Sequence, residues 1–387
     1  MFDALRKPPL GWLQLRHKPL RLLVALAGIS FAVLLIMMQL GFRSALFESA
    51  VRFHERFDYD IALFSPDSVF IVRPQPFSQR RLYQALAFED VVDVSPVYIF
   101  PGIWKNPWGS DRRAIYIIGI NPRDDVLDAP GFRESLSKIA RQDAVMFDAK
   151  ARPEFGPVAA AVQEHGSVRT EVNDREVEVV GTFEMGTSFG IDGTIITSDD
   201  NWLRLFPERS RGEIQLGLVR LVNGADVDAV RERLEAYLPD DVLVMTKQGF
   251  VDRETAYWGS ATPIGYVFFF GAIMGFVVGA IIVYQILFAD VSEHLNEYAT
   301  LRAIGYSNGF VSGIVLQQAV ILAALGFVPG VIIANWLYGS AAGATNLPIY
   351  LTVERAVMVF LMTFAMCSIS ALLAVRKLRR LDPADVF

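Results

Sequence analysis

Four long apolar runs dominate the pattern of hydrophobic and polar positions along the chain. They cover residues 22–41, 264–289, 310–338 and 356–375, and none contains Asp, Glu, Lys, Arg or His. Each reaches the ~20 residues that an α-helix needs to cross the hydrocarbon layer of a bilayer. One such helix can form the core of a soluble protein, but four predict a polytopic α-helical membrane protein.

Basic residues predict the orientation of these four helices. They gather before the first run (Arg6, Lys7, Arg16, Lys18, Arg21) and after the fourth (Arg376, Lys377, Arg379, Arg380). Because cytoplasmic segments carry the excess of Lys and Arg, segments 1–21 and 376–387 are predicted to be cytoplasmic. Segment 42–263 then lies outside the cytoplasm, as does the short loop 339–355, and 290–309 is a cytoplasmic loop. The first run is longer than the apolar core of a signal peptide, so we expect a retained helix.

Segment 1–21 mixes apolar with basic residues. The mixture fits a short amphipathic helix on the cytoplasmic face of the membrane, with Pro19 at the turn into the bilayer. An unstructured basic leader fits the composition equally well.

The large outer segment 42–263 has the pattern of a mixed α and β domain. Residues 59–64 and 114–120 are rich in β-branched and aromatic residues, and Asn173-Asp174 separates two further strand-like stretches as in a hairpin. Asp226 precedes a helical stretch, and strand, helix and strand follow one another in 214–245. We therefore predict an α+β sandwich with helices on a sheet.

Residues 248–258 lead from this domain back to the membrane. Tyr257 and Trp258 fit an interfacial aromatic belt. If the stretch continues as a helix into the second run, it couples the outer domain mechanically to that run.

Charge and cysteine content limit the partners of the outer segment. It contains 25 basic and 35 acidic residues, and the acidic excess disfavours nucleic acid as a partner. The only cysteine, Cys367, lies in the fourth run, so the outer domain uses no disulfide.

Signals of catalysis are weak. Gly186-Thr187-Ser188-Phe189-Gly190 matches the G-x-S-x-G elbow of hydrolases, but the residues after it resemble turn and strand rather than the required helix. The four histidines are far apart and form no metal-ligand spacing. We expect no catalytic residue and no metal site.

The energy source is predicted to lie in another subunit. The four runs contain no ionisable residue that could bind a coupling ion. None of the seven lysines follows a glycine, so the chain has no Walker A loop and no ATP site of its own. If the protein performs work, a partner binds the ATP.

Two of the apolar runs carry packing signals. Gly271, Gly275 and Gly279 form overlapping G-x-x-x-G steps, which predict close approach of another helix of the same chain or of a second copy. In the third run Pro329 is expected to kink the helix, and Gln317 and Gln318 are expected to face protein rather than lipid.

The cytoplasmic loop 290–309 is the predicted docking site of the partner. Val291, Leu295, Tyr298 and Leu301 have helical spacing, and Glu293 and Glu297 lie one turn apart. Gly305 is expected to end this helix. Anionic lipids would repel its acidic face, which favours docking to a protein over rest on the membrane.

At this loop the sequence resembles a known family. Glu297-Tyr298-Ala299-Thr300-Leu301-Arg302-Ala303-Ile304-Gly305 is similar to the E-x-x-x-L/I-R-A-x-G signature of the MacB/FtsX/LolC superfamily of ABC transporter permeases. The C-terminal Leu381-Asp382-Pro383-Ala384 is similar to its closing motif. The chain most resembles the DevC-type branch, the permeases of heterocyst-glycolipid exporters. One departure is Gln318, where many members carry Glu.

The resemblance implies a MacB-like periplasmic domain on a bacterial inner-membrane permease. It implies a homodimer, a separate ABC ATPase bound through Glu293, Glu297, Tyr298, Leu301, Arg302 and Gly305, a periplasmic adaptor and a TolC-like channel. ATP-driven motion would push lipid or other hydrophobic cargo, glycolipid-like by resemblance, into that channel.

Two other functions stay open. Some superfamily members are signalling scaffolds that activate a cell-wall hydrolase and move no cargo. An extracytoplasmic hydrolase built around Ser188 is the third hypothesis.

Overall fold

The computed structural model describes residues 10–188 and 190–378. It divides into two units, which are described separately. One is a helical bundle of residues up to 44, 264–342 and from 349 onward, and the other is an outer domain of residues 45–263 and 343–348. The basic residues Arg6, Lys7, Arg379 and Arg380 and the motif at 381–384 lie outside the described residues.

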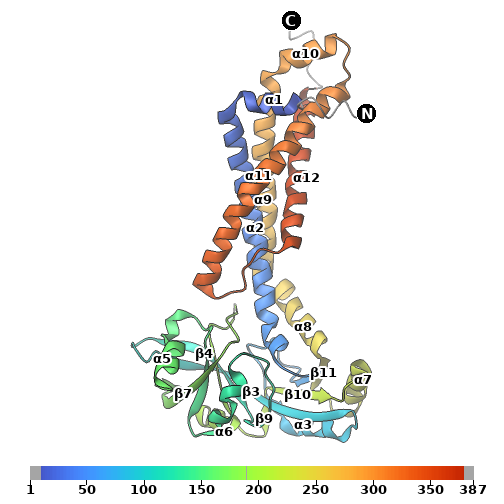
Figure 1. The fold of residues 1–387 in the computed structure, drawn as a ribbon. Helices are drawn as coiled ribbons and strands as arrows, with labels where there is room; N and C mark the ends of the chain where they lie inside the picture. Colours follow the sequence, from blue (N-terminus) through green and yellow to red (C-terminus); the bar gives the residue numbers. More distant parts are fainter. Residues whose placement is uncertain (1–9, 189, 379–387) are drawn as a thin grey trace. The chain divides into compact units, whose positions relative to one another are not determined.

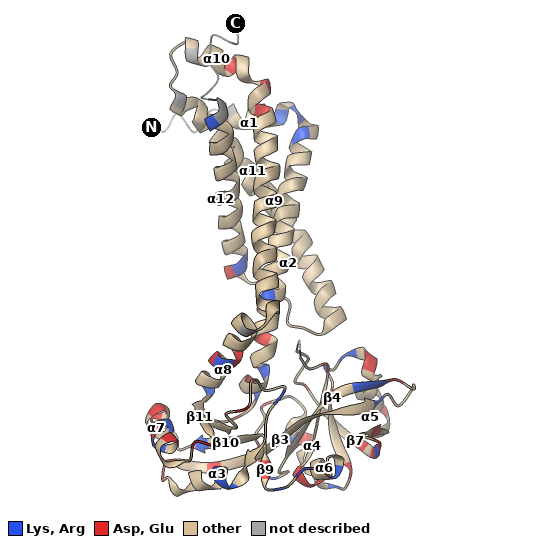
Figure 2. Cartoon of the chain, turned by 180° about the vertical axis from the view of Figure 1, so that it is seen from behind, with Lys and Arg blue, Asp and Glu red and all other residues tan. Residues whose placement is uncertain are grey.

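Four long apolar helices form the bundle (Figure 1). They are α2 (Pro19–Arg56), α9 (Pro263–Glu293), α11 (Asn308–Thr345) and α12 (Val353–Leu378). Figure 2 shows that their middle parts carry no charged residue, as helices in lipid require. The prediction of four spanning helices with a mixed α and β domain between the first and the second is confirmed.

Small residues and hydroxyl groups bring these helices together. Gly271, Gly275 and Gly279 lie on the side of α9 that faces Gln39, Ile36 and Ala32 of α2. Ser30 of α2 donates to the Gly326 carbonyl of α11 at 2.9 Å, and Ser370 of α12 donates to the Ala280 carbonyl of α9 at 2.8 Å. The glycine stripe of α9 therefore packs within the chain.

Two short helices lie at the end of the bundle where α2 begins and α9 ends. They are α1 (Leu10–His17) and α10 (Leu295–Ala303). The helical alternative for the N-terminal segment is therefore correct over the described residues.

A nine-stranded mixed sheet organises the outer domain. Its order is β11-β1-β10-β3-β4-β8-β5-β7-β6, with β4–β8 and β5–β7 parallel and the other neighbours antiparallel. The strands are β1 (Ile61–Phe64), β3 (Val91–Lys105), β4 (Arg112–Ile120), β5 (Ala144–Asp148), β6 (Val168–Val172), β7 (Arg175–Phe183), β8 (Thr194–Ser198), β10 (Leu216–Leu221) and β11 (Leu243–Thr246). A separate small ladder joins β2 (Phe77–Ser78) and β9 (Glu213–Ile214).

Helices cover the sheet and complete two hydrophobic cores. They are α3 (Gln79–Gln84), α4 (Phe132–Leu136), α5 (Val158–His165), α6 (Asp199–Leu205), α7 (Val227–Tyr237) and α8 (Lys247–Ala256). Trp202 of α6 and Leu234 of α7 belong to one core, and Phe132 of α4 and Phe250 of α8 to the other. The predicted sandwich of helices on a sheet is correct.

The path from α8 to α9 differs from a continuous helix. A π-helical turn (Tyr257–Ala261) follows α8, and Thr262 is extended at φ −110° and ψ 146° before α9 begins at Pro263. Proline supplies no N–H to continue a helical ladder, so the break is expected at this position. Trp258 is buried and packs edge-on against Phe70.

The loop after α11 is part of the outer domain. Thr187 Oγ1 donates to the Thr345 carbonyl at 3.2 Å, and Asn346 Nδ2 donates to the Ala151 carbonyl at 3.2 Å. Residues 343–348, the end of α11 and the start of the loop after it, therefore complete the outer domain.

Candidate functional site

The loop between α9 and α11 folds into one short helix with defined ends. α9 continues through Glu293, and α10 occupies Leu295–Ala303. Gly305 follows at φ +105°, a left-handed conformation that glycine adopts without a steric penalty. Gly305 is therefore the stop signal that the sequence indicated. Glu293, in contrast, is the last residue of α9 and precedes the loop helix, which begins at Leu295.

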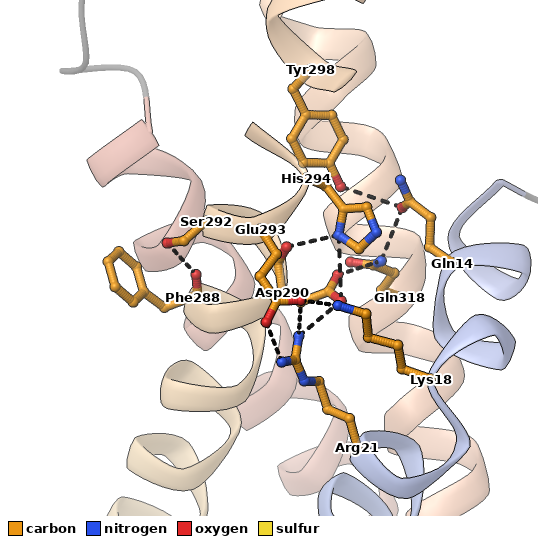
Figure 3. Close-up of polar contacts among 10 residues, drawn as sticks. All are labelled: Gln14, Lys18, Arg21, Phe288, Asp290, Ser292, Glu293, His294, Tyr298 and Gln318. Carbon is orange, nitrogen blue, oxygen red and sulfur yellow. Dashed lines mark hydrogen bonds and ion pairs between the residues drawn. The ribbon is translucent and has the colours of Figure 1, made fainter. Parts of the chain in front are cut away.

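A buried polar network joins α10 to three other helices (Figure 3). Gln318 of α11 donates from Nε2 to Asp290 Oδ2 at 2.9 Å and to Gln14 Oε1 of α1 at 3.1 Å. Tyr298 of α10 donates from its hydroxyl to Gln14 Oε1 at 3.3 Å. Because Gln318 and Tyr298 are almost fully buried, these bonds fix the rotation of α10 against α1, α9 and α11.

Two further contacts hold the end of α9 in this network. His294 Nδ1 lies 2.9 Å from the Asp290 carbonyl and 3.7 Å from Asp290 Oδ1. Burial raises the pKa of Tyr298 to about 12, so its hydroxyl stays a hydrogen-bond donor at any physiological pH.

Glu293 forms ion pairs within the chain. Arg21 Nη1 donates to Glu293 Oε2 at 2.8 Å, and Lys18 Nζ pairs with the same carboxylate. Arg21 also lies 4.0 Å from Asp290. Glu293 thus links the end of α9 to the segment where α2 begins, and its contact with the ATPase stays a prediction.

Exposed residues define the outward face of this region, which we call the coupling face. It consists of Glu297, Thr300, Ala303, Ile304, Gly305 and Tyr306. Ile304 is 71% exposed and Tyr306 is 47% exposed, which is unusual for large apolar side chains in water. An acidic residue beside exposed apolar residues fits a protein partner.

The remaining predicted site residues fall into two groups. Tyr298 points inward, so it positions α10 and does not lie on the coupling face. Leu301 is half-buried in α10, and the structure does not describe the side chain of Arg302. Gln318 is buried as expected, whereas Gln317 is exposed and accepts the Gly11 N–H at 3.3 Å.

Sequence patterns did not indicate Gln14, Lys18, Arg21 or Asp290 as site residues. Gln14, Lys18 and Arg21 bind partners hundreds of positions away in the sequence, and Asp290 directly follows the apolar run 264–289. The available signals were the charge of Asp290 at the end of that run and the departure at Gln318. The Gln318 amide donates to the Asp290 carboxylate, which a Glu at 318 could do only when protonated.

The alternative site around Ser188 has no catalytic geometry. Strand β8, not a helix, follows this loop, and Ser188 Oγ accepts the Gly190 N–H at 3.2 Å. Among the described residues, no group of three His, Cys, Asp or Glu is placed to hold a metal ion.

Comparisons with known proteins address both units. Residues 268–383 match the FtsX-like permease C-terminal family, and residues 22–237 match the MacB-like periplasmic core domain. No curated protein sequence matches the chain.

Solved structures also resemble part of the chain. The periplasmic region of MacB from Actinobacillus actinomycetemcomitans is 11% identical over 50% of this chain and 91% of that chain, with a TM-score of 0.34. The extracellular domain of the noncanonic ABC-type transporter YknZ from Gram-positive bacteria is 15% identical over 48% of this chain and 98% of that chain, with a TM-score of 0.32.

Proposed function

The chain belongs to the FtsX-like permeases with a MacB-like periplasmic core domain, within the MacB/FtsX superfamily of ABC-type permeases, and from this premise we propose how it works. A separate ABC ATPase binds the coupling face and supplies the ATP site, because the chain has no Walker A loop of its own. The protein itself needs no cofactor. It is a homodimer of the bacterial inner membrane with both termini in the cytoplasm.

The observation that carries this proposal is the way α10 is held. Its inner side is bonded through Tyr298, Gln14 and Gln318 to three helices, while its outer side exposes Glu297, Ile304 and Tyr306. A surface anchored in this manner transmits a push, because displacement of α10 must move α1, α9 and α11 with it. A helix resting loosely on the membrane would not do so.

The chain also offers a route from the bundle to the outer domain. α2 is a single helix from Pro19 to Arg56, so its first part belongs to the bundle and its last part to the outer domain. The loop 343–348 attaches the end of α11 to the same domain. ATP-driven movement of the helices would thus act on the outer domain, which drives lipid or other hydrophobic cargo through a periplasmic adaptor into a TolC-like channel.

The test is capture of partners with the purified full chain. A charge reversal at the coupling face, Glu297→Lys, is expected to reduce co-purification of the ATPase at least tenfold. The matched control is Glu208→Lys, which reverses an exposed acid of the outer domain and should leave the yield of ATPase unchanged. Mass spectrometry of the captured proteins is the measurement.

Each result has a defined meaning. Loss of the ATPase in Glu297→Lys alone, with an adaptor still captured by wild type, supports the exporter. Capture of the ATPase with a cell-wall hydrolase instead of an adaptor would favour the signalling scaffold. Equal ATPase capture by both variants would contradict docking at the coupling face.

A further inference from the structure

A charged cavity of about 530 Å³ lies within the outer domain. Its walls come from the end of α2, from the turn at 184–186 and from the loop residues 346–348. This volume is in the range of small-molecule binding sites, but most of these are lined by apolar side chains. A cavity lined by Arg, Lys, Asp and Glu instead fits a ligand that is itself charged.

Two arginines on successive turns of α2 line this cavity. Arg52 Nη1 donates to the Thr187 carbonyl at 3.3 Å, and Arg56 Nη1 donates to the Asp128 carbonyl at 3.2 Å. Glu48, one turn before Arg52 on α2, also lines the cavity and acts electrostatically on Arg52, as do Asp148 and Glu55. Each guanidinium carries five N–H donors, so most of them stay available for a phosphate or carboxylate in the cavity.

The turn at Gly186 is shaped so that the Arg52 side chain fits against it. Gly186 adopts φ +94°, and a Cβ atom at this position would collide with the Arg52 guanidinium. Asp148, which is fully buried, accepts the N–H groups of Gly186 at 2.8 Å and of Met185 and Lys150 at 3.0 Å. The turn is therefore held rigidly where it leaves space for the arginine.

Acidic side chains line the same cavity. Glu55 and Asp128 are exposed to it, and Glu184 lies 3.7 Å from Lys150. The described residues contain no group of three ligands suited to a metal ion, so an organic ammonium is the better cationic match. The cavity thus carries both guanidinium and carboxylate groups, which together favour a ligand with one negative and one positive group.

We propose that this cavity binds a phospho-amine, which is a group that contains both a phosphate and a primary ammonium. The phospho-amine is either a lipid headgroup or a small soluble molecule. The phosphate would lie against Arg52 and Arg56, and the ammonium against Glu55 and Asp128. Two of the walls are continuations of bundle helices, α2 and the loop after α11, so occupancy would influence the helices that carry the proposed transport motion.

The binding test needs neither the ATPase nor an adaptor, so its failure is distinct from failure of the proposed function. The full chain in nanodiscs is titrated calorimetrically with O-phosphoethanolamine, inorganic phosphate or ethanolamine. We expect O-phosphoethanolamine to bind at least tenfold more tightly than either fragment. Arg52→Gln and Arg56→Gln should each weaken binding at least tenfold, whereas the control Arg80→Gln, at an exposed position of α3, should not.

Thermal unfolding of each variant shows whether it is folded, and the two arginine variants serve as independent tests. Nanodiscs of phosphatidylethanolamine that block the probe, when phosphatidylglycerol nanodiscs do not, would identify a lipid headgroup as the source. Absence of this competition would identify a soluble ligand. Equal affinity for inorganic phosphate, no saturable binding, or wild-type binding by both arginine variants would overturn the proposal. If the wild-type chain binds no probe and the arginine variants lose capture of the adaptor, the cavity belongs to a protein interface. That result would also overturn the proposal.

Discussion

Asp290 at the end of α9 and Glu254 in α8 are both buried carboxylates, but their surroundings differ in kind. Asp290 accepts a hydrogen bond from Gln318 and lies 4.0 Å from the Arg21 guanidinium and 3.7 Å from His294. Glu254 accepts the Ile71 N–H and the Trp258 indole N–H, both at 3.2 Å, and neither donor is charged.

The two units differ in the groups that surround the buried carboxylate. In the bundle, the Arg21 guanidinium of α2 lies 4.0 Å from Asp290. In the outer domain, burial raises the pKa of Glu254 to about 7, and neutral donors and the charge of Arg253 offset this only in part. The Glu254 carboxyl is thus suited to a contact that changes with pH.

Glu254 holds a defined part of the outer domain. It binds the Ile71 N–H while the Tyr116 hydroxyl donates to the Ile71 carbonyl. Phe70 stacks on Tyr257 with ring centroids 4.5 Å apart. A change in the charge of Glu254 would therefore act on the segment that leads into α9.

The largest effect is expected from Gln318→Glu, which places a second buried carboxyl group against Asp290. Two like charges at hydrogen-bond distance repel, or one must take up a proton. We expect a loss of roughly 2–4 kcal/mol of stability and reduced ATPase capture. Thermal unfolding in detergent measures the first, and Gln317→Glu at the exposed neighbouring position should change little. Equal unfolding of both variants would contradict the network.

The next prediction concerns Glu254 and the pH dependence of the free energy of unfolding. Because the folded pKa of Glu254 lies above its ordinary value of 4.5, its protonated form favours the folded state. Its stabilising contribution is complete below pH 4.5 and is lost as pH rises through about 7, by at most roughly 3 kcal/mol. In Glu254→Gln, the free energy of unfolding should change less between pH 5 and 8 than it does in wild type. The exposed Asp252→Asn on the same helix should retain the slope, and an unchanged slope in Glu254→Gln would refute the assignment.

The smallest effect is expected from Glu293→Gln, which removes an exposed ion pair with Lys18 and Arg21. Exposed pairs contribute little and are screened by salt. The variant should unfold slightly earlier than wild type at low salt and together with it at 1 M salt. A difference that persists at high salt would show that Glu293 has a structural role beyond charge.

Patterns within a short stretch of sequence predicted their structures well. The hairpin at Asn173-Asp174 has both residues at positive φ, 50° and 60°, as a type I′ turn requires. Asp226 caps α7 by accepting the Ala229 N–H at 3.1 Å. These features depend on neighbours in the sequence, so the residue types alone indicate them.

Features that depend on distant residues could not be predicted in the same way. Helical spacing placed Tyr298 and Glu297 on one loop helix, but only packing against α1 decides that Tyr298 points inward. The same holds for Glu293, whose partners Lys18 and Arg21 precede it by more than 270 positions. The rotation of a short helix about its axis is set by the helices that it packs against, so its own sequence does not determine which side points inward.

The loop 343–348 has a consequence for the way the outer domain is defined. A protein piece cut from the sequence at 45 and 263 would omit the segment that accepts the Thr187 hydroxyl and donates to Ala151. Its surface there would be incomplete, and one wall of the charged cavity would be missing. The outer domain is assembled from two stretches of chain separated by α9 and α11, so it reaches its final form only after these two helices have been inserted.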